Sequence, residues 1–195
     1  MIWGVFMSQL RIIIADSNDA SRNTLKGMLL SSGHLIYEAR DGGSAVRLSR
    51  SLMPDLVLID MSITGMNAYE VAHIIDSDNV APVILITHTI QRGFIEEVRN
   101  YSVFAYLIKP IDRSMLLRLV EFVVENYKKY SALKNEIENL KKQIEARKKI
   151  ERAKGLLMKV KKMEENEAYT LMRKMSMDST LPMETIAERI LRKYS

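Results

Sequence analysis

The chain has 195 residues, 47% hydrophobic and 27% charged, an ordinary globular mixture that is enough for one medium domain and one small one. It contains no cysteine, which excludes disulfides, thiol nucleophiles and cysteine-based metal sites. The net charge of +5 is uneven, because residues 1–125 hold 11 basic and 14 acidic side chains while residues 126–195 hold 18 and 10. A polyanionic partner of the C-terminal part and a solvated helical face both explain this imbalance.

Residues 1–8 are interpreted as an N-terminal extension. The apolar stretch from Met1 to Phe6 is too short for a signal peptide and has no basic residue before it, and Met7 is an equally good start. Every apolar run is far shorter than the roughly 18 residues that span a bilayer. We therefore expect no membrane partner and a cytoplasmic location.

Residues 9–125 alternate between short apolar runs and amphipathic stretches. The runs are Leu10–Ala15, Leu35–Ala39, Leu56–Ile59, Val83–Ile86 and Tyr106–Ile108. Amphipathic stretches are Ala20–Leu30, Ser44–Leu52, Tyr69–Ile75, Phe94–Asn100 and a segment beginning at Arg113. Short runs that are apolar throughout are typical of parallel strands buried on both faces. The pattern predicts an α/β fold with a doubly wound, five-stranded parallel sheet.

Four of the predicted strands end in a polar residue, namely Asp16, Asp60, Thr87 and Lys109. In such sheets ligands bind at the carboxyl ends of the strands, so we expect these side chains to form one site. A carboxylate such as Asp60 can attack phosphorus and form an acyl phosphate. Crowded carboxylates favour Mg²⁺, and Lys109 suits a phosphoryl oxygen.

Residues 9–125 resemble the receiver domain of response regulators. The resemblance rests on Ile12–Asp16, Pro54–Asp60, Gly65–Met66, Thr87 and Ala105–Pro110. It implies a flavodoxin-like fold and a sensor histidine kinase as partner. It also implies that Asp60 is the phosphoacceptor, Thr87 the switch hydroxyl, Lys109 the phosphate-binding cation and Tyr106 the aromatic switch. The implied Mg²⁺ ligands are Asp16, Asp60 and the backbone carbonyl of Ser62.

The sequence departs from the receiver pattern at several positions. A second acidic residue is expected after Asp16, but Ser17 stands there, and a hydroxyl is a poorer Mg²⁺ ligand than a carboxylate. Other departures are Ile63–Gly65 in place of Met-Pro-Gly, Ala68 in place of glycine and the large His88 after Thr87. Two hypotheses follow, a working phosphoswitch and a degenerate receiver that serves for dimerisation.

A long helix is predicted from Arg113 to about Lys162, since Gly155 is its one glycine and it has no proline. Val123, Tyr130, Ile137 and Ile144 recur every seven residues, with Leu133 and Leu140 between them and polar exceptions at Asn126 and Arg147. This pattern predicts a coiled-coil linker over residues 126–150 that joins two chains as a parallel homodimer. The alternative is a single helix that packs back on its own domain.

Three helices are expected to form the C-terminal core. The end of the long helix offers Leu156, Leu157 and Val160. A second helix over about Glu165–Ser176 buries Ala168, Leu171, Met172 and Met175. A third, beginning near Pro182, buries Ile186, Ala187, Ile190 and Leu191.

Residues 134–195 resemble the ANTAR domain of transcription antiterminators. The resemblance rests on Ile150–Met158, Glu167–Tyr169, Leu171–Met177 and Ile186–Ala187. It implies binding to hairpin RNA in leader transcripts. Unstacked loop bases can stack on aromatic rings and arginine planes, and lysines can follow phosphates. The candidate RNA-binding residues are therefore Lys154, Lys159, Tyr169, Arg173 and Lys174, although Met158, Tyr169 and Met177 fit core positions better than base platforms.

We interpret the chain as a response regulator of transcription antitermination in which phosphorylation of Asp60 promotes dimerisation and binding of hairpin RNA. One alternative is a phosphorylation-independent scaffold, which Ser17 favours. The other is a DNA-binding regulator, which the methionines at 172, 175 and 177 disfavour. We expect no enzymatic output beyond the receiver's own phosphotransfer and dephosphorylation.

Overall fold

The structure is a computed structural model that describes residues 9–90, 94, 96 and 103–194. The chain divides into two compact units at Tyr130 and Ser131, called here the N-terminal unit and the C-terminal unit. Helix α5 (Arg113–Lys161) begins in the first unit and ends in the second. Within the described residues, no helix is long and apolar enough to cross a membrane.

The N-terminal unit contains a parallel five-stranded sheet in the order β2-β1-β3-β4-β5. Its strands are β1 (Arg11–Ala15), β2 (Leu35–Ala39), β3 (Leu56–Asp60), β4 (Val83–Thr87) and β5 (Ala105–Ile108). The order reverses between β1 and β3, as in flavodoxin-like folds, and places a ligand site at the carboxyl ends of these strands. The predicted doubly wound α/β fold and its five strands are confirmed.

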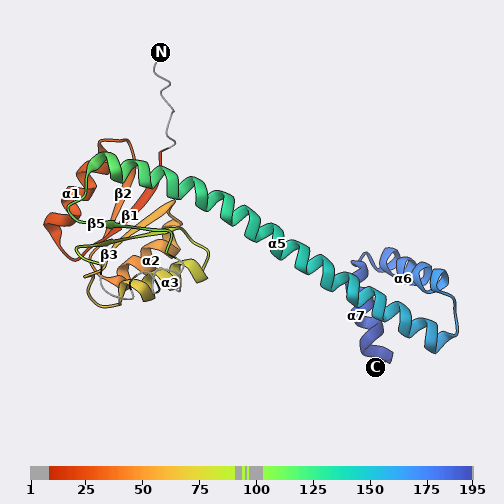
Figure 1. Cartoon of the computed structure of the whole chain (residues 1–195). Coiled ribbons are helices and arrows are strands. Elements are labelled where there is room, and N and C mark those ends of the chain that lie inside the picture. Colours follow the sequence, from red (N-terminus) through yellow and green to blue (C-terminus); the bar gives the residue numbers. More distant parts are fainter. Residues whose placement is uncertain (1–8, 91–93, 95, 97–102, 195) are drawn as a thin grey trace, which may run out of the picture. The chain divides into compact units, whose positions relative to one another are not determined.

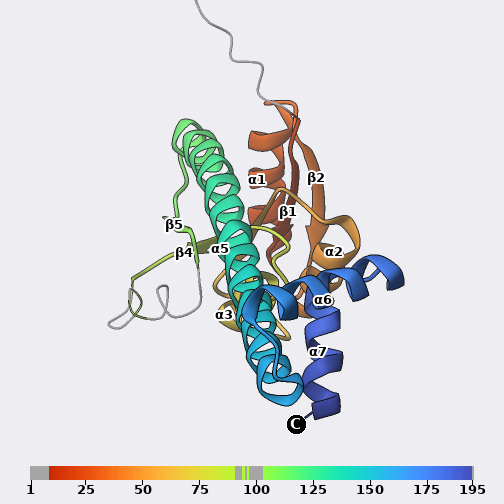
Figure 2. The same cartoon turned by 90° about the vertical axis from the view of Figure 1, so that its right-hand side faces the viewer.

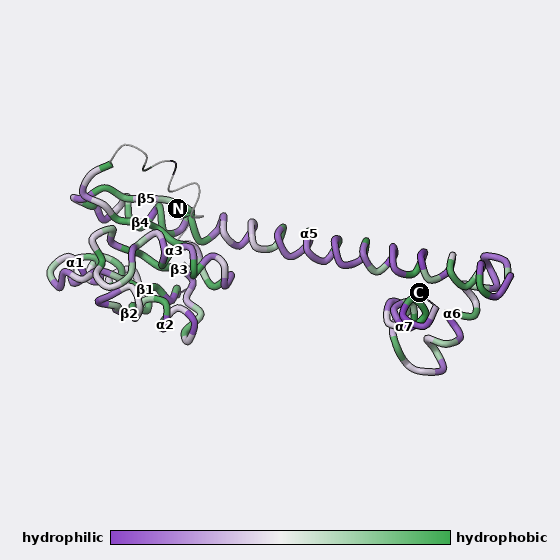
Figure 3. Tube along the Cα trace, turned by 90° about the horizontal axis from the view of Figure 1, so that it is seen from below, coloured by the Kyte–Doolittle hydropathy of each residue, from purple (hydrophilic) through white to green (hydrophobic). Residues whose placement is uncertain are grey.

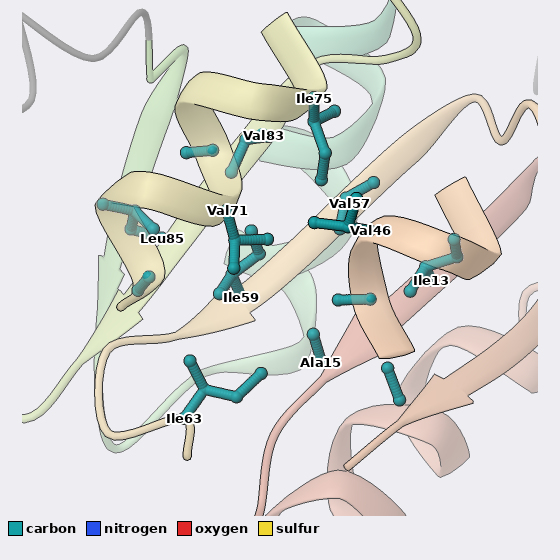
Figure 4. Close-up of a cluster of buried hydrophobic side chains, with 14 of the residues drawn as sticks. Ile13, Ala15, Val46, Val57, Ile59, Ile63, Val71, Ile75, Val83 and Leu85 are labelled. Atoms are coloured by element: carbon teal, nitrogen blue, oxygen red, sulfur yellow. The ribbon is translucent and has the colours of Figure 1, made fainter. Parts of the chain in front are cut away.

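Helices cover both faces of the sheet (Figure 1, Figure 2). Helices α2 (Gly42–Leu52) and α3 (Ala68–Ser77) pack on the face that presents Ile13, Val57, Ile59 and Leu85 (Figure 4). Helix α1 (Asp19–Leu30) and the first turns of α5 pack on the opposite face. Alternate residues of each strand thus enter different clusters, which explains why the strands are apolar throughout.

Short polar side chains begin the helices. Asn18 accepts a hydrogen bond from the backbone N–H of Ser21 at the start of α1, and Asp41 forms a capping box with Ser44 at the start of α2. At the start of α5, the Asp112 carboxylate accepts from the N–H of Met115 at 2.9 Å. Each cap satisfies a backbone donor that the first helical turn leaves unpaired, so the turn after each strand is fixed locally.

The helix predicted over Phe94–Asn100 lies largely outside the described residues, where only Phe94 and Glu96 are assigned to a helix. The long predicted helix is confirmed and ends at Lys161. The middle of α5 is mainly hydrophilic, in contrast to the apolar strands (Figure 3). Residues Leu133, Ile137, Leu140 and Ile144 of the predicted coiled-coil seam are each at least 50% exposed.

One predicted seam position is wrong. Val123 is 1% exposed and belongs to the core of the N-terminal unit, beside Leu116 and Val120. The first turns of α5 cover the sheet, so their apolar face serves the chain's own core and is not available to a second copy. Tyr130 is partly engaged, since its ring lies 5.6 Å from that of Phe104. The unpartnered seam therefore begins at Leu133.

The C-terminal unit packs α6 (Glu165–Ser179) and α7 (Met183–Tyr194) against the end of α5. Its buried residues are Ala153, Leu157, Ala168, Met172, Ile186, Ala187 and Ile190. Two core predictions are wrong, because Val160 is 50% and Met175 is 37% exposed. Helical spacing identifies an apolar stripe but does not set its width, and both residues lie at its edge.

Candidate functional site

The four polar residues predicted at strand ends lie on four neighbouring strands. Asp16 follows β1, Asp60 ends β3, Thr87 ends β4 and Lys109 follows β5, and these strands are consecutive in the sheet. Register supports the same placement, since Asp60 pairs with Ile86 and Thr87 with Ile108. The sheet therefore gathers two carboxylates, a hydroxyl and an ammonium group at one edge.

Lys109 connects the two carboxylates. Its Nζ atom lies 2.5 Å from Oδ2 of Asp60, 3.3 Å from Oδ2 of Asp16 and 2.7 Å from Oγ of Ser21. Asp16 and Asp60 are 1% and 2% exposed, so two negative charges face one positive charge away from solvent. Buried charges need partners of this kind, and the remaining negative charge attracts a further cation.

The pKa of Asp60 reflects this environment. Burial alone would raise the pKa of its carboxyl group, but hydrogen bonds from Lys109 and from the hydroxyl and backbone N–H of Ser62 outweigh burial and lower it. The Asp60 carboxylate is therefore ionised at neutral pH, as a nucleophile must be. The lowered pKa stabilises the fold above the ordinary aspartate pKa, and this stabilisation is lost as the pH falls through the folded value.

The two predicted switch residues have partners outside the carboxylate pair. Thr87 is 7% exposed, and its hydroxyl donates to the carbonyl of Thr89 at 2.8 Å. The ring of Tyr106 packs edge-on against Phe94, with centroids 5.1 Å apart. Thr87 thus lies at the site edge with its hydroxyl bound to its own loop, and Tyr106 is held by an aromatic contact.

Hard oxygen ligands for Mg²⁺ are present but few. Asp16 and Asp60 supply two carboxylates, and Ser62 lies beside them, donating its N–H to Asp60 Oδ1 at 2.8 Å. Mg²⁺ in proteins is often held by only one or two carboxylates together with water and phosphate oxygens, so the donor set fits this ion. Across residues 9–90, 94, 96 and 103–194, no group of three or more His, Cys, Asp or Glu side chains could hold a metal.

Sequence reasoning missed Arg22. This buried side chain donates to the carbonyl of Asp16 at 2.6 Å and to Glu38 at 2.9 Å, and it also pairs with Asp19. It therefore fixes the turn that carries Asp16. Arg22 follows Asn18 by one helical turn, but an arginine in a helix is usually exposed, so no sequence pattern indicates its burial.

A groove of about 430 Å³ opens beside Lys109. It is lined by Ser21, Thr24, Leu25, Met28, His88, Lys109, Pro110 and Ile111. His88, one of the departures from the receiver pattern, therefore lies next to the site and not in the sheet. The Lys109–Pro110 peptide bond is cis.

Lys154 of the C-terminal unit has a structural environment that its sequence position did not predict. Its ammonium group lies 2.6 Å from Glu151 and 2.7 Å from Glu165, and its side chain is 12% exposed. The hydrogen bonds that Lys154 donates to these two carboxylates, of Glu151 and Glu165, raise its pKa. Lys149 likewise pairs with Glu184 at 2.6 Å and with Glu188 at 2.7 Å. These pairs hold α6 and α7 against α5.

Four other RNA-binding candidates are exposed, namely Lys159, Tyr169, Arg173 and Lys174. Tyr169 is 48% and Met177 72% exposed, so their interpretation as core residues is wrong, whereas Met158 packs against the core as expected. Tyr169 and Arg173 are one helical turn apart and share a face of α6. That face presents an aromatic ring beside a guanidinium group.

Family models match both parts of the chain. Residues 12–121 match the response regulator receiver domain, and residues 138–191 match the ANTAR domain. The transcriptional regulatory protein PdtaR of Mycobacterium tuberculosis is 34% identical over 182 residues, which cover 93% of this chain and 89% of PdtaR. The similarity thus spans both units.

Solved structures support the fold of the N-terminal unit. The receiver domain of NarL from Mycobacterium tuberculosis aligns with a TM-score of 0.57 and 23% identity, covering 60% of this chain and 97% of that one. The receiver domain of a Pseudomonas aeruginosa sensor histidine kinase, solved with a magnesium ion in its active site cleft, aligns with a TM-score of 0.55 and 24% identity, covering 60% and 99%.

Proposed function

Because the chain belongs to the response regulators that join a receiver domain to an ANTAR domain, we propose that phosphorylation of Asp60 controls its binding of hairpin RNA in leader transcripts. Its output is RNA binding in transcription antitermination. The observation that carries the phosphorylation step is the buried Asp60 carboxylate, ionised and held by Lys109 at the carboxyl edge of the sheet. The proposed location is the cytoplasm, where leader transcripts are made.

In the proposed reaction an Asp60 oxygen attacks the phosphorus atom of a phosphohistidine on a sensor kinase, and the P–N bond breaks as the acyl phosphate forms. Lys109 is already within hydrogen-bond distance of Asp60, so its ammonium group can move to a phosphoryl oxygen. Asp16, Asp60 and the backbone carbonyl of Ser62 would hold Mg²⁺, which would supply positive charge against the phosphoryl oxygens. Apart from this phosphotransfer and slow hydrolysis, we propose no enzymatic activity.

The switch follows from the present hydrogen bond of Thr87. Its hydroxyl donates to Thr89, a neutral acceptor in its own loop. A phosphoryl group on Asp60 offers a charged acceptor on the neighbouring strand, and hydrogen bonds to charged acceptors are stronger. Thr87 would turn toward it, and Tyr106 would leave Phe94 as the loop moves. The energy of one such bond is sufficient to change the population of two conformations several-fold.

For RNA, the exposed face of α6 is the best candidate surface. Tyr169 and Arg173 offer planar groups on which unstacked loop bases can stack, and Lys174 and Lys159 add positive charge. Lys154 stays a candidate, but its two carboxylate partners occupy it in the free protein. We therefore propose Tyr169 and Arg173 as the base contacts in preference to Lys154.

Dimerisation through α5 is proposed from the four exposed seam residues Leu133, Ile137, Leu140 and Ile144. Isoleucine occupies one of the two apolar positions of the heptad and leucine the other, a combination that favours a parallel coiled coil of two helices. Two RNA-binding units held in one dimer gain affinity for paired hairpins by effective concentration.

Charge supports the parallel orientation. One side of the interface is flanked by the residues that directly follow Leu133, Leu140 and Arg147 in the sequence. These residues are Lys134, Lys141 and Lys148. In an antiparallel pair these lysines would face one another, whereas in a parallel pair Lys141 of one chain faces Glu136 of the other. Like charges across the interface disfavour the antiparallel form.

Because the chain has no cysteine, one introduced thiol tests the dimer. We expect Leu133→Cys to form a disulfide between two chains under mild oxidation, and acetyl phosphate to raise its yield. The matched control Asn135→Cys, on the opposite helical face, should stay uncrosslinked. In an antiparallel seam centred between Ile137 and Leu140, the two positions 133 would lie about 16 Å apart, too far for a disulfide.

The output is tested by binding of the purified chain to loop-randomised RNA hairpins and to duplex DNA, each with and without acetyl phosphate and Mg²⁺. We expect selective hairpin enrichment that strengthens with acetyl phosphate in the wild type and not in Asp60→Asn. Hairpin binding indifferent to acetyl phosphate would favour the phosphorylation-independent scaffold, which the engaged hydroxyl of Ser17 supports. Preference for duplex DNA would overturn the RNA output.

A further inference from the structure

A single hydroxyl joins three loops at the edge of the phosphorylation site. Ser17, directly after Asp16, donates from Oγ to the carbonyl of Arg40 at 2.8 Å. The same oxygen accepts from the backbone N–H of Thr64 at 2.9 Å and lies 3.0 Å from the Thr64 hydroxyl. The loops that follow β1, β2 and β3 therefore meet at Ser17. We call the contacts between Ser17 and Thr64 the Ser17–Thr64 link.

Further contacts fix Thr64 in the same place. Its carbonyl accepts from the N–H of Gly42 at 3.0 Å, and Thr64 forms an isolated parallel bridge with Asp41. Gly42 approaches this loop so closely that a Cβ atom on it would lie 2.7 Å from Cβ of Met66 and 2.8 Å from the Met66 carbonyl. The loop after Asp60 is thus held against the start of α2.

Both members of the link are departures from the receiver pattern, and each explains the other. A carboxylate at position 17 would repel the carbonyl of Arg40, which now accepts a hydrogen bond from Ser17. It would also add a third negative charge beside Asp16 and Asp60, against the single ammonium group of Lys109. A neutral hydroxyl avoids both costs.

We propose that the Ser17–Thr64 link holds the loop after Asp60 in place without a metal ion and leaves the site with weak Mg²⁺ affinity. The hydroxyl of Ser17 is engaged by Arg40 and Thr64, so it is not oriented as a ligand. Two carboxylates remain for the ion, and the affinity of such sites rises with ligand charge. Phosphorylation of this chain would then need a higher Mg²⁺ concentration than in a site with three carboxylates. This inference rests on the Mg²⁺ site of the proposed function.

Mg²⁺ titration of the full chain by calorimetry tests the proposal. We expect Ser17→Asp to bind Mg²⁺ at least about tenfold more tightly than the wild type, since it adds a carboxylate beside two others. Its unfolding temperature should be lower without Mg²⁺ and recover when the ion is added. The control Ser51→Asp adds the same charge at an exposed position in α2, and its Mg²⁺ affinity should equal that of the wild type.

A second variant tests the link without adding charge. Ser17→Ala removes the oxygen that accepts from the Thr64 N–H and contacts the Thr64 hydroxyl, so both contacts of the link are lost. We expect amide hydrogen exchange over residues 61–66 to quicken about fivefold without Mg²⁺, corresponding to one modest hydrogen bond. Unchanged exchange would mean that the link holds nothing in place.

The outcomes separate this inference from the proposed function. If the wild type binds Mg²⁺ as tightly as Ser17→Asp, the link does not limit the ion, and the proposed phosphorylation site stands. If neither binds Mg²⁺, then Asp16 and Asp60 are not its ligands, and both the inference and the proposed metal site are wrong.

Discussion

In the N-terminal unit the charged side chains in and beside the candidate site are buried and paired. In the C-terminal unit most candidate RNA contacts lie on the surface. Asp16, Arg22 and Asp60 are each at most 2% exposed and held by named partners. Arg173 and Lys174 are exposed, and no ion pair is assigned to either among the described residues. Chemistry at phosphorus needs fixed geometry, while a polyanion is best met by cations that solvent can reach. We therefore expect that replacing a charged residue lowers mainly the stability in the N-terminal unit and mainly the RNA affinity in the C-terminal unit.

The largest expected effect is on stability in the N-terminal unit. Arg22→Met should lower the free energy of unfolding by about 3 kcal/mol, because it leaves the buried Asp16 carbonyl without this donor and takes from Glu38 one of its two cations, the other being Lys26. The matched control is Arg50→Met, which breaks a 2.7 Å pair with Asp78 at a side chain 59% exposed. It should cost less than about 1 kcal/mol. If urea unfolding shows the same loss of free energy for both variants, the contrast between buried and exposed ion pairs is wrong.

On the C-terminal unit the expected loss is of binding and not of stability. Replacing Arg173 and Lys174 together by alanine should weaken hairpin RNA binding about 30-fold, since a stacking plane and a phosphate contact are removed. Arg192 and Lys193 of α7 form a matched adjacent pair, and their double alanine variant should bind within a fewfold of the wild type. Similar losses from both pairs in a filter-binding assay would mean that charge alone determines affinity.

A smaller effect is expected from pH. Burial lowers the pKa of His34, whose Nδ1 accepts from the N–H of Leu10 and whose Nε2 has no assigned partner. The unfolded chain therefore gains protons first as the pH falls below about 6.5, and stability declines by at most about 1.4 kcal/mol per pH unit. His34→Phe should flatten this part of the stability profile. A wild-type profile that is already flat between pH 7 and 5.5 would contradict the assignment.

The smallest effect is predicted for Lys154→Met. Because Lys154 is occupied by Glu151 and Glu165, its loss should lower the unfolding temperature slightly and change RNA affinity less than about threefold. The stability change should shrink further at high salt, which screens exposed pairs. A loss of RNA affinity as large as that of the Arg173 and Lys174 variant would return Lys154 to the contact surface.

Much of the N-terminal unit follows from its sequence because both faces of the sheet are buried. Runs such as Val57–Ile59 and Ile84–Ile86 have no polar side, which favours strands, and the polar residue after each run marks the site edge. Asp16, Asp60, Thr87 and Lys109 could therefore be predicted together. The Ser17–Thr64 link could not, because it depends on contacts between loops far apart in sequence. Arg22 could not, because an arginine in a helix is usually exposed.

The helices were predicted less completely, since helical spacing shows that a stripe is apolar and not what covers it. Val123 continues the seven-residue pattern of the seam but packs in the core of its own unit. Met177 fits a core position and is 72% exposed. Lys154 is a candidate RNA contact by sequence, but its two acidic neighbours, one of them on another helix, account for its charge within the fold.

The exposed seam has a consequence for gene dosage. In the proposed dimer, a second chain would cover the four exposed apolar side chains on α5 from Leu133 to Ile144. The dimeric fraction would then rise with the number of copies in the cell as well as with the signal, by mass action. In a cell that makes few copies, RNA binding by the proposed dimer would stay low even under strong stimulation. The rate of synthesis would then be a second input to the same switch.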